Sequence, residues 1–300
     1  MNDFHGYPAE VLEQGGLRLG YLTTAGPRLV TLSLAGGANL LAELPDFQQA
    51  TPEGPYSFLG GHRLWRSPEL MPETYARDDR GLRVEPLPDG VRLTQPDGLG
   101  LSKSIEVHLA ADRPAVTLLH RIANRAQKSV RLAPWTLTML QLGGVAILPQ
   151  PVGNSDTQGL LPNRRLALWP YSRLGDARLH WGDDFILLQA EAALPPFKLG
   201  WYNPAGWSAY WLNGVLFRKS CAPFRSDRYP DGGCNAETYC NDRFIELEGL
   251  GALKTLQPGA ETELTETWEL FSSLEQPFLP ERIRRLIREL EPSRSLESKS

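Results

Sequence analysis

Carboxylate, amide and aromatic side chains alternate in the last third of the chain. Asn235, Glu237 and Tyr239 are each separated by one residue, and so are Glu246 and Glu248. Because every second side chain of a β-strand points to the same face, we expect each set to share a face. An amide beside carboxylates can hydrogen-bond to neighbouring hydroxyl groups. These residues therefore predict a cleft for a carbohydrate.

Glu248 is the candidate general base of this cleft, since burial can raise the pKa of a glutamate toward neutrality. It could instead be a solvated carboxylate or the partner of a cation on a neighbouring strand. Glu237, with Asn235, is the candidate contact for sugar hydroxyls, although an exposed edge strand would give the same pattern.

A second polar segment, GGHRLWRSPE, covers residues 60–69. His62 is a candidate general acid because an imidazole titrates near neutrality, but it could simply be hydrogen-bonded inside a loop. Arg63 can hold sugar or carboxylate oxygens, and Trp65 can stack on a sugar ring. Glu69 contacts the ligand or pairs with a nearby arginine.

Several further residues could complete such a site. Trp135, Trp201 and Trp211 are candidate stacking platforms, or they fill the core. Lys219 ends a predicted strand and could hold a carboxylate or phosphate at the rim of the cleft; a solvated strand end is the alternative. His120 is a second candidate acid.

The elements that must position these residues are short strands. Between residues 81 and 148, apolar-rich runs follow one another with turn residues between them, and residues 102–109 alternate with a period of two. This pattern predicts antiparallel sheet with one wet face. Further strands are expected at 17–24, 28–35, 39–44 and throughout the second half, with a long functional loop over 45–80 and one helix over 280–290.

Composition narrows the class of protein. The 300 residues are 41% hydrophobic and 22% charged, as in a soluble globular protein, and the net charge of -4 argues against nucleic acid as a partner. No apolar run approaches a membrane span, and no signal peptide is evident. Three cysteines without a dense spacing pattern suggest free thiols in the cytoplasm. We expect no metal and no cofactor; the oligomeric state stays open.

Two motifs together resemble the galactose mutarotase-like (aldose 1-epimerase-like) superfamily, in particular its DUF4380-type branch. They are GGHRLW-x-x-PE near residue 60 and YPDGGCNAETY near residue 230. The resemblance covers about residues 10–272. It implies one domain over residues 1–300: an all-β, large antiparallel β-supersandwich with a short C-terminal helix and a concave sheet that binds carbohydrate.

The resemblance also implies roles at the anomeric centre. Aldose 1-epimerases open a sugar ring with a carboxylate base and a histidine acid. Here IELEG (245–249) is followed by LQPG (256–259), an order that puts Glu248 on the base position. The strand that would carry the acid, LAPWTLTML (132–140), has no histidine, so His62 or a bound water would serve. A non-catalytic sugar-binding protein, or a hydrolase or lyase using Glu237 and Glu248, are the alternatives.

Overall fold

The computed structural model describes residues 2–223, 228–272, 275 and 281–285, which form antiparallel strands and one short helix at residues 281–285. The strands are β1 (Asn2–Phe4), β2 (Tyr7–Gln14), β3 (Leu17–Leu22), β4 (Arg28–Leu34), β5 (Glu43–Gln49), β6 (Tyr56–Gly60), β7 (His62–Ser67), β8 (Arg83–Leu87), β9 (Gly90–Gly98), β10 (Leu101–Leu109), β11 (Ala115–Asn124), β12 (Val130–Leu140), β13 (Val145–Pro149), β14 (Leu166–Leu168), β15 (Leu179–Trp181), β16 (Phe185–Gln189), β17 (Phe197–Trp201), β18 (Trp207–Leu212), β19 (Val215–Ser220), β20 (Ala236–Cys240), β21 (Ile245–Leu250), β22 (Lys254–Leu256) and β23 (Glu261–Phe271).

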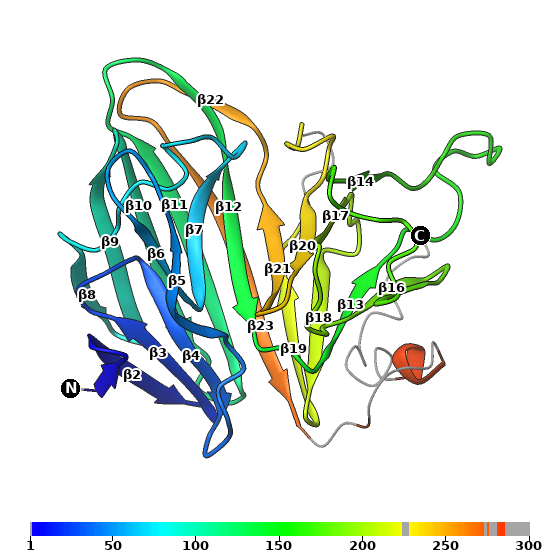
Figure 1. Cartoon of the computed structure of the whole chain (residues 1–300), viewed down its shortest axis with the longest axis horizontal. Coiled ribbons are helices and arrows are strands. Elements are labelled where there is room, and N and C mark those ends of the chain that lie inside the picture. The colour runs from blue at the N-terminus through cyan, green and yellow to red at the C-terminus, as the bar shows by residue number, and fades with distance from the viewer. Residues whose placement is uncertain (1, 224–227, 273–274, 276–280, 286–300) are drawn as a thin grey trace, which may run out of the picture.

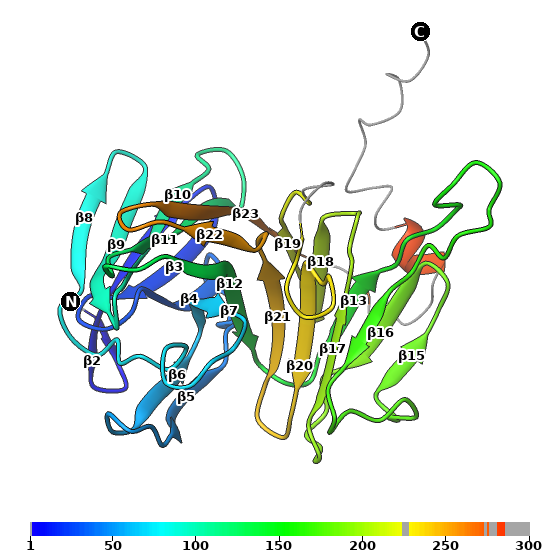
Figure 2. The same ribbon diagram turned by 90° about the horizontal axis from the view of Figure 1, so that it is seen from above.

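Two large sheets pack face to face. The first sheet has the strand order β1-β2-β3-β4-β7-β12-β21-β20-β17-β14, with β22 paired to β12. The second sheet has the order β15-β16-β13-β18-β19-β23-β11-β10-β9-β8, and β5 and β6 form a separate hairpin. In Figure 1, β7, β12, β21, β20 and β17 run side by side through the middle of the molecule. Figure 2 shows the β5–β6 hairpin set off from the two sheets, on the side of β7.

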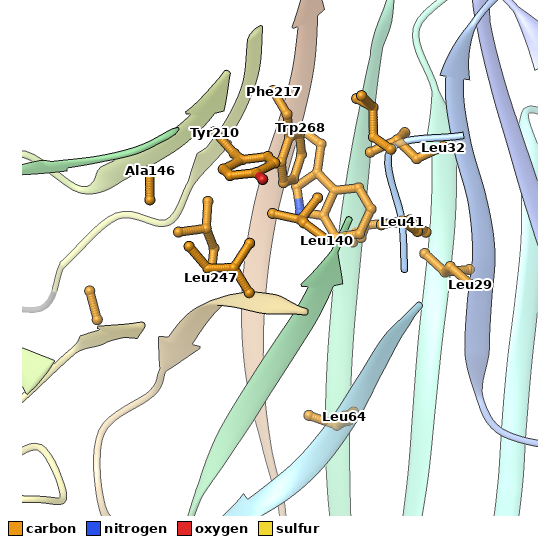
Figure 3. Close-up of a cluster of buried hydrophobic side chains, with 14 of the residues drawn as sticks. Leu29, Leu32, Leu41, Leu64, Leu140, Ala146, Tyr210, Phe217, Leu247 and Trp268 are labelled. Atoms are coloured by element: carbon orange, nitrogen blue, oxygen red, sulfur yellow. The ribbon is translucent and has the colours of Figure 1, made fainter. Parts of the chain in front are cut away.

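The main core fills the space between the sheets. Leu140 and Leu247 of the first sheet lie near Phe217 and Trp268 of the second (Figure 3), and Leu64 belongs to the same buried cluster. Strand alternation therefore gives the first sheet an inner face, which meets this core, and an outer face, which is turned away from the second sheet.

The sequence prediction of an all-β fold with one short C-terminal helix is confirmed. The helix is described at residues 281–285, where Ile283 packs on Val145 and Ile147; the rest of the predicted 280–290 lies outside the described residues. The predicted free cysteines are also found: Cys221, Cys234 and Cys240 form no disulfide. None of the described helical residues forms a segment that could cross a membrane.

Two strand predictions were wrong. The expected loop over 45–80 contains most of β5, all of β6 and all of β7; every residue of β7 is buried, so that strand has no period-two alternation to detect. The expected strand over 39–44 is mostly irregular, because the side-chain oxygen of Asn39 accepts hydrogen bonds from the backbone N–H groups of Leu32 and Leu41.

Candidate ligand-binding site

A cavity of about 340 Å³ opens on the outer face of the first sheet. We call it the aromatic pocket, because rings dominate its wall. Its lining residues are Phe47, Gln49, Phe58, Arg63, Trp65, Glu69, Tyr75, Trp135, Leu137, Trp169, Tyr171, Pro196, Lys198, Tyr239, Phe244 and Glu246. A cavity of this size, mostly apolar with a few charged groups, is typical of a small-molecule site.

Strand register brings the pocket residues together. Trp65 on β7 pairs with Trp135 on β12, while Tyr239 on β20 pairs with both Lys198 on β17 and Glu246 on β21. The five strands are consecutive in the sheet, so alternate residues of each point outward over one continuous surface.

Glu246 is a buried carboxyl group in the wall of this pocket. Its Oε1 lies 3.1 Å from Nη2 of Arg63, whose guanidinium packs 4.4 Å from the Trp65 ring centroid. Burial raises the pKa of Glu246 to about 7; the positive charge of Arg63 opposes the shift, and the negative charge of Glu248 adds to it. A carboxyl group with this pKa can both accept and donate a proton at neutral pH.

Lys198 carries the positive charge on the other side of the pocket. Its Nζ lies 2.9 Å from Oε2 of Glu237 and 3.0 Å from Oε2 of Glu248, and 4.7 Å from the ring centroids of Trp135 and Trp169. Burial alone would lower the pKa of Lys198, but the two carboxylates outweigh it and hold that pKa well above its usual value. Lys198 is therefore a permanent cation.

The carboxylates beneath Lys198 keep unused hydrogen-bonding capacity. Trp135 donates its indole N–H to Oε2 of Glu248 at 2.7 Å. Oε1 of Glu248 and Oε1 of Glu237 are buried and have no hydrogen-bond partner among the described residues. Burial raises the pKa of Glu237 well above its usual value, against the attraction of Lys198. Neither Glu237 nor Glu248 lines the aromatic pocket directly; both act on it through Lys198.

Five of the residues selected from the sequence line the aromatic pocket: Arg63, Trp65, Glu69, Trp135 and Tyr239. Two more, Glu237 and Glu248, reach it through Lys198. Glu69 accepts a hydrogen bond from the hydroxyl of Tyr75, which fixes both at the edge of the pocket.

One charged member of the pocket, Lys198, was not predicted from the sequence. Lys198 lies between apolar neighbours in FKLGW, and a lysine inside an apolar strand is the feature of the sequence that could have predicted its role in the site. Glu246 was predicted to share the ligand-binding face with Glu248, but the role of base was given to Glu248 because of the family resemblance. Trp169 and Tyr171 come from an irregular segment, for which no periodicity exists.

His62 lies on the inner face, away from the pocket. It alternates with Arg63, so the two side chains leave β7 on opposite faces. Its Nε2 is 2.8 Å from Nε2 of His120, and its Nδ1 is 2.9 Å from Oγ1 of Thr138. Burial, with the charges of His120 and Lys219, lowers the pKa of His62 well below its usual value. His62 and Glu248, which were expected to act in one site, therefore lie on opposite faces of the first sheet.

Other selected residues are also elsewhere. Lys219 is buried between the sheets, 3.1 Å from Glu266, and is not at a rim. Asn235 is bonded to Asn203, whose N–H donates to its side-chain oxygen at 2.6 Å. Trp201 is fully buried and donates to the Pro149 carbonyl, and Trp211 packs beside Val145 and Ile147; neither lines the pocket.

The inner face holds a group with metal-ligating atoms. His62, His120 and Glu266 offer ligand atoms within 4.8 Å of one another. The ligand atoms already have partners: Nε2 of His120 lies 2.8 Å from Nε2 of His62, and Glu266 accepts hydrogen bonds from Thr136 and Trp268. The protein's own hydrogen bonds thus account for this cluster.

Comparison with solved structures finds this architecture at low sequence identity. A putative aldose 1-epimerase from Escherichia coli K12 is 14% identical with a TM-score of 0.57, over 89% of this chain and 100% of that one. A galactose mutarotase-like protein from Lactobacillus casei is 12% identical with a TM-score of 0.54, over 88% and 100%. A TPR-domain containing protein from Parabacteroides distasonis is 13% identical with a TM-score of 0.58, over 91% of this chain and 50% of that one.

These likenesses show the galactose mutarotase-like fold. Family models and curated protein sequences give no match. The DUF4380-type branch stays a prediction from the two motifs.

Proposed function

We propose that this protein binds a sugar in the aromatic pocket and interconverts its anomers by general acid–base catalysis. The observation that carries the proposal is Glu246, a buried carboxyl group with a pKa of about 7 in the wall of a ring-lined cavity. The likeness of the fold to a putative aldose 1-epimerase supports the same reaction class.

In the proposed reaction, Glu246 accepts the proton of the anomeric hydroxyl. The C1–O1 bond becomes a carbonyl while the bond from C1 to the ring oxygen breaks, and the ring oxygen takes a proton from bound water, leaving a hydroxide that recovers this proton when the ring closes. Closure on the other face of the carbonyl reverses these steps. Glu246 then returns its proton, so the cycle consumes nothing.

Lys198 has an electrostatic role in this scheme. A cation with a strongly raised pKa does not release its proton, but it stabilises negative charge that develops on the ring oxygen. Glu248, the base expected from the resemblance, instead fixes Lys198 together with Glu237. The rings of Trp65, Trp135 and Trp169 supply apolar surface for a sugar face.

The test measures sugar binding and anomer exchange separately. Candidate hexoses, pentoses and uronates are screened by thermal shift, and exchange of a binding sugar is followed by magnetisation-transfer NMR. Glu246→Gln should lower the exchange rate by about 10²-fold or more while the sugar still binds. The matched control is Glu85→Gln, which changes an exposed glutamate on β8. Equal exchange rates in wild type and Glu246→Gln would exclude the mechanism.

Sugar binding without catalysis is the second candidate function. It is favoured by one observation: none of the described residues that line the aromatic pocket is a histidine. A sugar that binds without any acceleration of anomer exchange would support this function. Hydrolysis by Glu237 and Glu248 is less well supported, because both carboxylates contact one ammonium group rather than two sides of a cavity.

A further inference from the structure

A second and larger cavity, of about 670 Å³, has an unusual charge. Four arginines line it, and we call it the arginine pocket: Arg131, Arg164, Arg165 and Arg228. Among the described residues of its wall there is no aspartate or glutamate. The chain as a whole carries a net charge of -4, so this concentration of positive charge runs against the overall balance.

Two of the four guanidinium groups are anchored. Arg164 donates its Nε–H to the Pro151 carbonyl at 3.2 Å and lies 3.7 Å from Asp183. Arg165 donates to the Gly232 carbonyl at 3.1 Å. A Cβ on Gly233 would lie 2.4 Å from Nη1 of Arg165, so the glycine leaves room for this side chain.

The other two, Arg131 and Arg228, make no hydrogen bond or ion pair from their guanidinium groups to any residue that the structure describes. The buried Arg66 donates a hydrogen bond to the Arg131 carbonyl at 3.3 Å, which fixes the backbone at Arg131. The carboxylate of Asp231, next to Gly232 in the chain, accepts a hydrogen bond from Ser67 instead of lining the pocket.

We propose that the arginine pocket is a second ligand site, which binds the phosphate or sulfate group of a small molecule. Guanidinium groups pair with such oxyanions through two parallel hydrogen bonds, and several converging arginines recognise a doubly charged group. Without an anion, four like charges around one cavity repel one another. The cavity is bordered by residues 155–165 and 228–233, and its volume of about 670 Å³ is in the range of small-molecule sites.

The site differs from the aromatic pocket in position and chemistry. Arg131 and Trp135 lie on the same outer face of β12, four residues or about 13 Å apart. Neither pocket shares a lining residue with the other. Binding in the arginine pocket therefore does not depend on the proposed sugar chemistry, and sugar-free probes test it separately.

The test uses inorganic phosphate, sulfate and glycerol 2-phosphate at constant ionic strength, with chloride as the reference anion. Thermal shift and calorimetric titration are run on wild type, on Arg131→Gln/Arg228→Gln and on Arg113→Gln/Arg125→Gln. The last pair removes two exposed arginines from other parts of the surface, so both double variants have the same net charge. All changed side chains are exposed, and the fold of each variant is checked by its melting temperature in chloride.

We expect phosphate or its ester to raise the melting temperature of wild type and of the control pair, and to bind Arg131→Gln/Arg228→Gln at least tenfold more weakly. Tighter binding of glycerol 2-phosphate than of phosphate would identify an organic ester as the ligand, and equal binding would identify the free ion. The proposal is overturned if none of the three anions binds, or if all three proteins bind them equally.

Discussion

Glu237 and Glu248 lie opposite each other on β20 and β21 and share the ammonium group of Lys198. Burial raises the pKa of Glu237 well above its usual value, and the positive charge of Lys198 opposes that shift. The trio thus holds one cation at the pocket wall with two carboxyl groups buried beneath it. A buried group of this kind is costly to break.

Removing the cation should destabilise the fold. In Lys198→Met, the carboxylate of Glu248 loses its counter-charge in a buried site, and we expect a loss of about 3–5 kcal/mol in the free energy of unfolding. Urea denaturation measures this, with Lys128→Met at an exposed position as the control. Adding Glu248→Gln should recover part of the loss; a double variant as unstable as the sum of the single ones would show that the residues are not coupled.

Stability should depend on pH through Glu246. Its pKa is about 7 in the folded protein against 4.5 for the ordinary group, so the folded state binds the extra proton between these values. Protonated Glu246 therefore stabilises the folded state fully below about pH 4.5, and this stabilisation is lost as the pH rises to about 7. The difference in the free energy of unfolding is about 3 kcal/mol by linkage. Melting temperatures of wild type and Glu246→Gln should diverge over this range, with wild type falling; parallel curves would refute the shift.

Catalysis should have the opposite dependence on pH. The proposed mechanism needs Glu246 ionised, so the rate of anomer exchange should rise with pH through a midpoint near 7. NMR exchange rates from pH 5 to 8, on a sugar that binds, measure this. A rate that falls over the same range would assign the proton transfer to another group.

Trp169 should matter for binding more than for stability. It is half-buried in an irregular segment and contributes a ring to the pocket and to the surroundings of Lys198. We expect Trp169→Ala to weaken sugar binding about tenfold, since stacking and cation–π contacts are each worth about 1 kcal/mol. Calorimetry compares it with Trp181→Ala, which removes an exposed indole outside the pocket. Equal affinity in both variants would remove Trp169 from the site.

The hydroxyl of Thr138 should stabilise the interior and leave binding unchanged. Nζ of Lys219 donates to it at 3.1 Å, and it bonds to Nδ1 of His62 at 2.9 Å. Thr138→Val keeps the shape but leaves His62 without this partner, so we expect a cost of about 1–3 kcal/mol. Thr117→Val on β11 is the control. A loss of sugar affinity in Thr138→Val would contradict the separation of the two faces.

The sequence was most informative where strands are buried on one side. The period of two over 102–109 predicted the strand that the structure places at Leu101–Leu109: Ile105, Val107 and Leu109 are buried and Ser104 and His108 are partly exposed. Ser102 and Glu106, on the face expected to be wet, are buried. The strand alternation also placed Tyr239 and Glu248 on the ligand-binding faces, whereas Arg63, Trp65 and Trp135 were predicted from their residue types alone.

The site residues that the sequence did not predict are brought together by pairing between segments that are distant in the chain. Lys198 belongs to the site only because β17 pairs with β20, which a local pattern cannot reveal. The sequence predicts a loop around His62, and a loop gives no alternation of faces. Because the segment is strand β7, His62 and Arg63 point to opposite faces, and His62 points inward. Composition also could not indicate the arginine pocket, since Arg131, Arg165 and Arg228 are far apart in the chain.

The two faces of strand β12 have different roles. Trp135 and Leu137 line the aromatic pocket on the outer face, and Thr136 and Thr138 accept hydrogen bonds from the buried Lys219 on the inner face. A shift of one residue in its pairing would exchange the two sets, leaving hydroxyls in the pocket and an indole against Lys219. A single-residue insertion or deletion in this strand would therefore damage recognition and folding together. Natural variation in chain length should be confined to the connecting loops.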